Sequence, residues 1–177
     1  GDYSLIFGAF SSANMNEYNT FVVADFPGNL VIIEYYEPSD AEFSGELHIN
    51  KISQAYRDLG ELLSVEEDSA YNDINCSEGL EWQLEKHAVC MYTFDENDNS
   101  YLCSGALINN IHNDGTPYFL TANHCVSSST VASTIVAYFN YETEGCGMRE
   151  KTHSTLSGAD LLSTGSNSDF TLLRFTK

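Results

Sequence analysis

Short apolar runs separated by turn-forming residues fill the second half of the sequence. From residue 87 onward, six such runs have the length of strands and are too short for buried helices. Polar clusters at residues 95–99 and 113–115 have the composition of hairpin turns. The pattern predicts a mainly β fold, a small six-stranded antiparallel barrel or sandwich. The expected strands are residues 87–94, 101–108, 118–125, 134–142, 155–163 and 170–175.

Apolar runs in the first part of the chain are fewer and less regular. Residues 21–24 and 30–36 form strand-like runs on either side of a turn-like Asp-Phe-Pro-Gly-Asn sequence, and residues 46–52 alternate as a short strand does. These runs predict a small β-rich N-terminal segment over residues 1–65.

An acidic stretch separates the two parts. It begins Glu66-Glu67-Asp68 and lacks a periodic apolar face, which favours a solvated connector over a cation site. We therefore expect three parts: the N-terminal segment, an acidic connector and lead-in segment over residues 66–86, and a barrel domain over residues 87–177.

Composition excludes several classes of partner. The 177 residues carry 26 Asp and Glu against 7 Lys and Arg, a formal net charge of -19, and 42% of them are hydrophobic, which predicts a folded acidic protein. Nucleic-acid binding draws its affinity from basic side chains, so no nucleic-acid partner is expected. No apolar run approaches the roughly 20 residues of a membrane-spanning helix, so no membrane span is expected.

Five cysteines all follow residue 75. Their odd number and the lack of a Cys-x-x-Cys pair favour two disulfides and one free thiol, and hence a secreted protein, over a zinc site. A calcium loop beginning at Asp95 is also disfavoured, because Ser100 and Ala106 stand where such a loop needs Gly and Glu. We expect neither a metal nor a cofactor.

Two residues carry the candidate chemistry. His124 ends an apolar run beside Cys125, and Asp169 immediately precedes the last apolar run. Taken alone, His124 fits a structural histidine and Asp169 fits a turn-capping residue. Taken together, they suggest an imidazole whose tautomer is held by a carboxylate, as in a Ser-His-Asp triad.

A resemblance strengthens that interpretation. The sequences Leu-Cys-Ser-Gly-Ala-Leu-Ile at 102–108, Thr-Ala-Asn-His-Cys at 121–125 and Ser-Asp-Phe-Thr-Leu-Leu at 168–173 follow one another in the order of the first barrel of trypsin-like serine proteases. The resemblance covers about residues 70–175 and is greatest to bacterial lysyl endopeptidases. It also takes in residues 75–79 and 136–141.

The resemblance implies a fold and a role for each site residue. The fold would be a six-stranded barrel of the trypsin-like type, the first half of such an enzyme. His124 would be the general base and Asp169 its orienting carboxylate. Disulfides would join Cys103 to Cys125 and Cys76 to Cys146, leaving Cys90 unpaired as a small buried hydrophobe.

The chain also departs from this family. The family carries its nucleophilic serine and oxyanion hole in a Gly-x-Ser-Gly sequence of a second barrel. No such sequence occurs in these 177 residues, so we expect them to lack the nucleophile, the oxyanion hole and the second barrel. Ser104 aligns with a structural position, and Ala70 stands where the family has a cysteine that reaches the second barrel. Residues 28–38 and 46–53 are similar to the end of a bacterial pro-region. Because no Lys or Arg lies between Arg57 and Lys86, self-processing at a basic residue there is not expected.

Two functions follow as expectations. The first is a fragment of a secreted, lysyl endopeptidase-like serine endopeptidase, inactive as given, which would act on a polypeptide if the serine-bearing half were present. The alternative is a non-catalytic extracellular assembly or adhesion module, able to self-assemble through the barrel face that a second barrel would otherwise cover.

Overall fold

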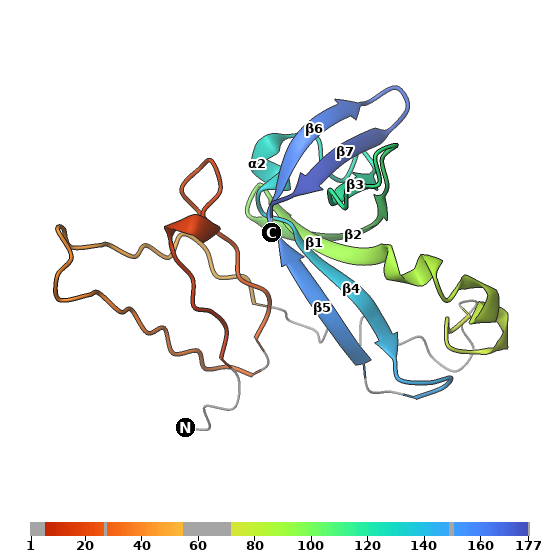
Figure 1. Ribbon diagram of the computed structural model, residues 1–177, viewed down its shortest axis with the longest axis horizontal. Coiled ribbons are helices and arrows are strands. Elements are labelled where there is room, and N and C mark those ends of the chain that lie inside the picture. Colours follow the sequence, from red (N-terminus) through yellow and green to blue (C-terminus); the bar gives the residue numbers. More distant parts are fainter. Residues whose placement is uncertain (1–5, 27, 55–71, 149–150, 177) are drawn as a thin grey trace. The chain divides into compact units, whose positions relative to one another are not determined.

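Seven antiparallel strands form one sheet that curls into a half-barrel (Figure 1). The computed structural model describes residues 6–26, 28–54, 72–148 and 151–176. Across the sheet the strands follow the order β5-β4-β1-β2-β3-β7-β6. Their bounds are β1 Val89–Glu96, β2 Asn99–Ile108, β3 Tyr118–Thr121, β4 Val136–Thr143, β5 Lys151–Ser157, β6 Ala159–Gly165 and β7 Phe170–Phe175, with a short helix α2 at Ser129–Ala132.

The predicted mainly β, antiparallel fold is confirmed, but one predicted strand is in fact two. The single strand expected over residues 155–163 is wrong, because the chain bends at Gly158, whose φ is 73°. Glycine adopts this left-handed conformation without the steric cost that a Cβ brings. The Gly158 N–H donates to the Ile135 carbonyl at 2.8 Å. The bend separates β5 from β6, which are the two edge strands of the sheet.

The strand that leads to His124 is shorter than predicted. The run over residues 118–125 was expected to be one strand, whereas β3 ends at Thr121. The N–H groups of Cys125 and Val126 both donate to the Ala122 carbonyl, each at 3.2 Å. A strand cannot make such local bonds, so His124 lies in a tight turn at the end of β3.

The three strands predicted near the N-terminus are wrong. Within residues 6–26 and 28–54 the structure has one 3-10 turn, η1 at Ser12–Asn14, and no strand. Apolar alternation favours an extended backbone, but a strand also needs a neighbour for its N–H and C=O groups. Residues 30–36 and 46–52 lack that ladder, and their side chains are exposed, with Ile52 at 80%.

The chain forms two compact units. One contains residues 1–24 and 72–177, and the other contains residues 25–71. Residues 66–71 of the predicted connector and lead-in segment, Ala70 among them, lie outside the described residues. The chain from residue 72 to β1 contains two 3-10 helices, η2 at Ser77–Trp82 and η3 at Glu85–His87.

Aromatic rings fill the interior of the half-barrel. Alternation along β1 turns Cys90, Tyr92 and Phe94 inward, and each is buried. The Phe119 ring from β3 lies 5.6 Å from that of Tyr92 and 5.1 Å from that of Phe175 on β7. This packing joins the central strands to the hairpin that carries Asp169.

Both faces of β4 are covered. Its outward residues Val136 and Tyr138 form a second buried cluster with Ala24, against which Val22 packs. Val22 and Ala24 therefore belong to the packing of the sheet. This explains why the four residues from Val136 are all buried where a half-exposed strand would alternate.

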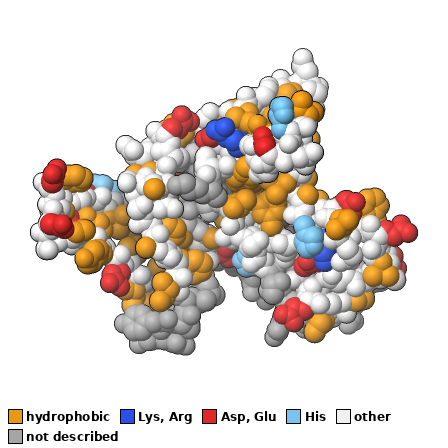
Figure 2. Space-filling model, viewed as in Figure 1, with side chains coloured by type: hydrophobic (Ala, Val, Ile, Leu, Met, Phe, Trp, Pro, Cys, Tyr) orange, Lys and Arg blue, Asp and Glu red, His pale blue; other side chains and the backbone are white. Residues whose placement is uncertain are grey.

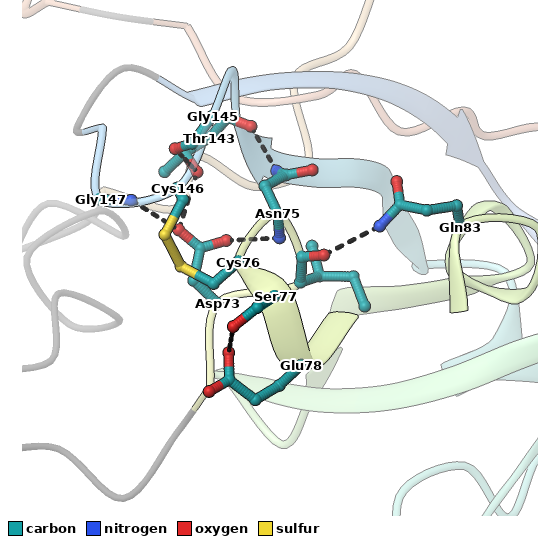
Figure 3. The surroundings of a disulfide bond; sticks show 11 residues. Asp73, Asn75, Cys76, Ser77, Glu78, Gln83, Thr143, Gly145, Cys146 and Gly147 are labelled. Carbon is teal, nitrogen blue, oxygen red and sulfur yellow. Dashed lines mark hydrogen bonds between the residues drawn. A yellow bond between two sulfur atoms is a disulfide. The ribbon is translucent and has the colours of Figure 1, made fainter. Parts of the chain in front are cut away.

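A disulfide and a set of hydrogen bonds attach the lead-in segment to the end of β4 (Figure 3). Beside the bridge from Cys76 to Cys146, the Asp73 carboxylate accepts from the Gly147 N–H and from the Thr143 hydroxyl, both at 3.2 Å. The Asn75 amide donates to the Thr143 carbonyl at 2.6 Å. These bonds hold residues 73–76 in place, ahead of the two 3-10 helices that lead into β1.

Candidate functional site

His124 and Asp169 meet through two hydrogen bonds, although they lie 45 residues apart. The imidazole Nδ1 lies 2.7 Å from one carboxylate oxygen of Asp169. The backbone N–H of His124 donates to the other carboxylate oxygen at 2.9 Å. One carboxylate thus holds both the side chain and the main chain of the same histidine, which restricts where the ring can point.

The conformation of Asp169 explains how it reaches the histidine. Asp169 is the last residue of the β6–β7 turn, immediately before Phe170, and its φ is 50°. Asp tolerates this left-handed region better than most residues. β3 pairs with β7, so the turn that follows β3 lies beside the start of β7. The sheet register therefore places the carboxylate against His124.

The hydrogen bonds favour the ionised form of Asp169. Its pKa is lowered from the ordinary value of 3.8, first by the backbone N–H of His124 and then by the imidazole. A carboxylate that stays charged accepts from Nδ1 and stabilises a positive charge on the ring. The carboxylate is therefore available as an acceptor at neutral pH.

The other edge of the imidazole faces solvent. The side chains of His124 and Asp169 are 70% and 50% exposed. With Nδ1 occupied as the donor to Asp169, the neutral ring keeps the lone pair of Nε2 free for a proton. An exposed imidazole nitrogen with a lone pair can accept a proton from a group that approaches it.

A disulfide lies next to the His124 ring. Cys103 of β2 is bonded to Cys125, and the two sulfurs and an imidazole nitrogen lie within 4.8 Å of one another. This is the one group of potential metal ligands among the described residues. Sulfurs joined in a disulfide are not thiolates, so the group does not form a zinc site. Its effect is to tie the turn after β3 to β2.

The remaining cysteines pair as the resemblance implies. Cys76 is bonded to Cys146, and Cys90 is a free, buried thiol. Burial raises the pKa of Cys90 to about 12, so it remains a neutral thiol and not a nucleophilic thiolate at neutral pH.

Ser104 has a structural contact through its backbone. It is on β2, and its backbone carbonyl accepts from the Thr121 hydroxyl at 3.0 Å. Among the described residues no hydrogen bond joins the Ser104 side chain to His124. The Thr121 hydroxyl also accepts from the buried Tyr92 hydroxyl at 2.7 Å. The threonine of the Thr-Ala-Asn-His sequence therefore joins β1, β2 and β3 just below the histidine turn.

Sequence reasoning missed three polar residues around the pair. Asn123 precedes the histidine, and Thr164 and Thr171 flank the turn that carries Asp169. They form a continuous set of hydrogen bonds. The signal was present in the sequence as two threonines placed on either side of a Ser-Asn-Ser-Asp turn. Their pairing depends on a register that the sequence alone did not reveal.

One known protein family matches the part of the chain that contains the sheet and the candidate site. The family model for the lysyl endopeptidase C-terminal domain matches residues 66–177. The match covers the complete sheet, both disulfides and the His124–Asp169 pair. Among the described residues, no helix is long and apolar enough to span a membrane.

Proposed function

The chain belongs to the lysyl endopeptidase C-terminal domain family, and from this premise we propose that it is the His- and Asp-bearing half of a secreted trypsin-like serine endopeptidase. The observation that supports the proposal most directly is the double hydrogen bond from His124 to Asp169. A carboxylate on Nδ1 and an open Nε2 are what a general base in acyl transfer requires.

In this proposal each residue has a defined role. Nε2 of His124 accepts the proton of a serine hydroxyl as that oxygen attacks a peptide carbonyl, and later donates it to the leaving amine. Asp169 holds the ring in the Nδ1–H tautomer and stabilises the imidazolium. The serine and the oxyanion hole come from a second, serine-bearing barrel, as a continuation of this chain or as a separate one.

The 177 residues by themselves are proposed to lack peptidase activity. They contain no Gly-x-Ser-Gly sequence, and a general base without a nucleophile and oxyanion donors does not cleave peptides at a useful rate. The substrate class is polypeptide. A preference for lysine would depend on an acidic residue in the other barrel.

An activity assay on matched variants tests the proposal. The gene product that carries the serine-bearing barrel should hydrolyse a lysyl peptide anilide. Asp169→Asn should lower kcat/KM by about 10⁴-fold and His124→Ala by about 10⁶-fold. Asp98→Asn, which removes a charge in the β1–β2 turn, is the control and should leave the rate unchanged. The 177-residue chain alone should show no hydrolysis. Full activity of Asp169→Asn would contradict the proposed role.

Secretion and a pro-region complete the proposal. Two disulfides fit an oxidising compartment outside the cytoplasm. The chain before the barrel would be a pro-region by its similarity to secreted bacterial relatives. Mass spectrometry of the native extracellular material tests both points, because a mature form would start between about residues 60 and 75 and retain both bridges.

The alternative is an extracellular assembly or adhesion module. It is favoured by large apolar side chains that lie exposed, including Val89 and Leu120 on the outer face of the sheet. In Figure 2, hydrophobic side chains are spread over the visible surface among few basic ones. Sedimentation of the purified chain separates the two functions, since a monomer over a wide concentration range would count against assembly.

A further inference from the structure

Two threonines face each other across the hairpin that carries Asp169. Thr164 of β6 and Thr171 of β7 are directly opposite in the ladder, and the turn between them ends at Asp169. Their hydroxyl oxygens lie 2.7 Å apart. Thr171 is fully buried, which requires its hydroxyl to have a partner inside the protein.

The threonine pair continues on both sides into the turn that carries His124. The Thr171 hydroxyl donates to the Val126 carbonyl at 2.6 Å. The Asn123 amide nitrogen donates to the Thr164 hydroxyl at 2.7 Å. Asn123 and Val126 bracket His124 and Cys125, so the two ends of the histidine turn are each bonded to one strand of the aspartate hairpin.

The donors and acceptors fix the direction of these bonds. A carbonyl can only accept, so the one hydroxyl proton of Thr171 is committed to Val126. Thr164 must therefore donate to Thr171, with the Phe170 carbonyl at 3.1 Å as a secondary acceptor. The oxygen of Thr164 then accepts from Asn123. One unidirectional chain of bonds results, and such chains polarise and strengthen their members.

We propose that this chain of bonds, from Asn123 through Thr164 and Thr171 to Val126, positions the imidazole of His124 against Asp169. The inference rests on the proposed function, since it concerns the geometry of that pair. Thr164 and Thr171 touch neither the imidazole nor the carboxylate in any described hydrogen bond. They are positioning residues that set the distance between the two segments on which the pair is carried.

A purely structural role would not require this arrangement. A buried valine at position 171 would fill nearly the same volume, and elsewhere in the barrel the interior positions of β7 are apolar, as at Leu173 and Phe175. A buried hydroxyl costs desolvation that its hydrogen bonds must offset. The chain of bonds also runs between the two turns that bear the site, and not across the barrel.

Nuclear magnetic resonance on the 177-residue chain tests the inference without requiring activity. The variants are Thr171→Val and Thr164→Val, which remove a hydroxyl, and Thr171→Ser, which keeps it. Thr93→Val, on β1 outside the hydrogen-bond chain, is the matched control. Two quantities are measured: the ratio of Nδ1–H to Nε2–H tautomers of the neutral His124 ring, and the pKa of the Asp169 carboxyl.

The expected result is that loss of either threonine hydroxyl weakens the hydrogen bonds between His124 and Asp169. In both valine variants the Nδ1–H fraction should fall and the pKa of Asp169 should rise toward 3.8. Thr171→Ser should restore the wild-type values, and Thr93→Val should keep them. Because Thr164 is exposed, its variant keeps the test decisive even if Thr171→Val fails to fold.

A comparison with Asp169→Asn separates two kinds of failure. If Asp169→Asn changes the tautomer ratio and both valine variants of a folded protein do not, the positioning role is overturned and the proposed pair stands. If Asp169→Asn itself leaves the ratio unchanged, Asp169 does not orient His124, and the proposed function fails with it.

Discussion

A single carboxylate at the site accepts hydrogen bonds from two different parts of one histidine. Asp169 binds Nδ1 with one oxygen and the backbone N–H with the other. The backbone bond is the larger cause of its lowered pKa. The interaction therefore links folding to ionisation even before any catalytic role is considered.

Replacing Asp169 by Asn should change how stability depends on acid. Because the pKa of Asp169 is lowered in the folded state, the ionised carboxylate stabilises the fold fully at pH values above the unfolded-state pKa of 3.8. This stabilisation is lost as the pH falls through the pKa of the folded state. The free energy of unfolding of wild type minus that of Asp169→Asn should be constant above about pH 5 and shrink below about pH 4. Urea titrations at several pH values measure it. Asp98→Asn is the charge-matched control, and parallel curves for wild type and Asp169→Asn would refute the linkage.

At the scale of elements, two glycines shape the sheet for different reasons. Gly158 needs its positive φ for the bend between β5 and β6, whereas Gly105 of β2 needs the absence of a side chain. A Cβ on Gly105 would lie 2.7 Å from a ring carbon of Phe119 and 2.8 Å from the Leu120 carbonyl oxygen. A Cβ on Gly158 would meet the Ser133 carbonyl at an ordinary 3.6 Å.

Alanine at these two positions should therefore lower the free energy of unfolding by different amounts. Gly158→Ala should lower the free energy of unfolding by about 1 kcal/mol, the cost of a left-handed alanine. Gly105→Ala should cost more, about 2–3 kcal/mol, because backbone and a buried ring must move. Urea midpoints at constant m-value measure both. An equal or reversed order would show that crowding at Gly105 is relieved elsewhere.

Sequence patterns predicted the strands of the sheet better than the positions where strands end or fail to form. Strands from residue 87 onward were anticipated because apolar alternation and turn composition agree there, and the last strand was predicted at residues 170–175, where β7 lies. The bend at Gly158 was missed because a glycine within an apolar run does not reveal its φ. The N-terminal strands were wrong because alternation selects an extended backbone and supplies no pairing partner.

The candidate site was predictable in identity and not in geometry. His124 and Asp169 stood out because their motifs follow a recognisable order. The left-handed conformation of Asp169 and the threonines opposite each other depend on the register of β6 and β7, which includes a shift between Leu161 and Ser163. Local sequence does not determine where such a shift occurs, so the hydrogen-bond chain behind the site could not be anticipated.

At the scale of the whole molecule, acidity and packing divide the chain differently. Of the 26 acidic residues, 17 lie within residues 1–85, which marks the first part of the chain as distinct. Packing instead joins residues 1–24 to the barrel, through Ala24 against Val136 and Tyr138. A domain boundary near residue 65 predicts that the N-terminal part unfolds independently of the barrel. Packing of residues 1–24 with the barrel predicts that the two unfold together.

Charge placed at Ala24 distinguishes these two descriptions. If the first residues complete the barrel, Ala24→Asp buries a carboxylate against apolar side chains and should lower the free energy of unfolding of the whole sheet by about 2–4 kcal/mol. Ala41→Asp, at an exposed position, is the control and should change it by less than about 0.5 kcal/mol. Urea unfolding followed by near-ultraviolet circular dichroism of the buried tyrosines measures both. An unchanged barrel transition in Ala24→Asp would favour an independent N-terminal domain. A shifted single transition would mean that removal of the first residues also uncovers the outer face of β4.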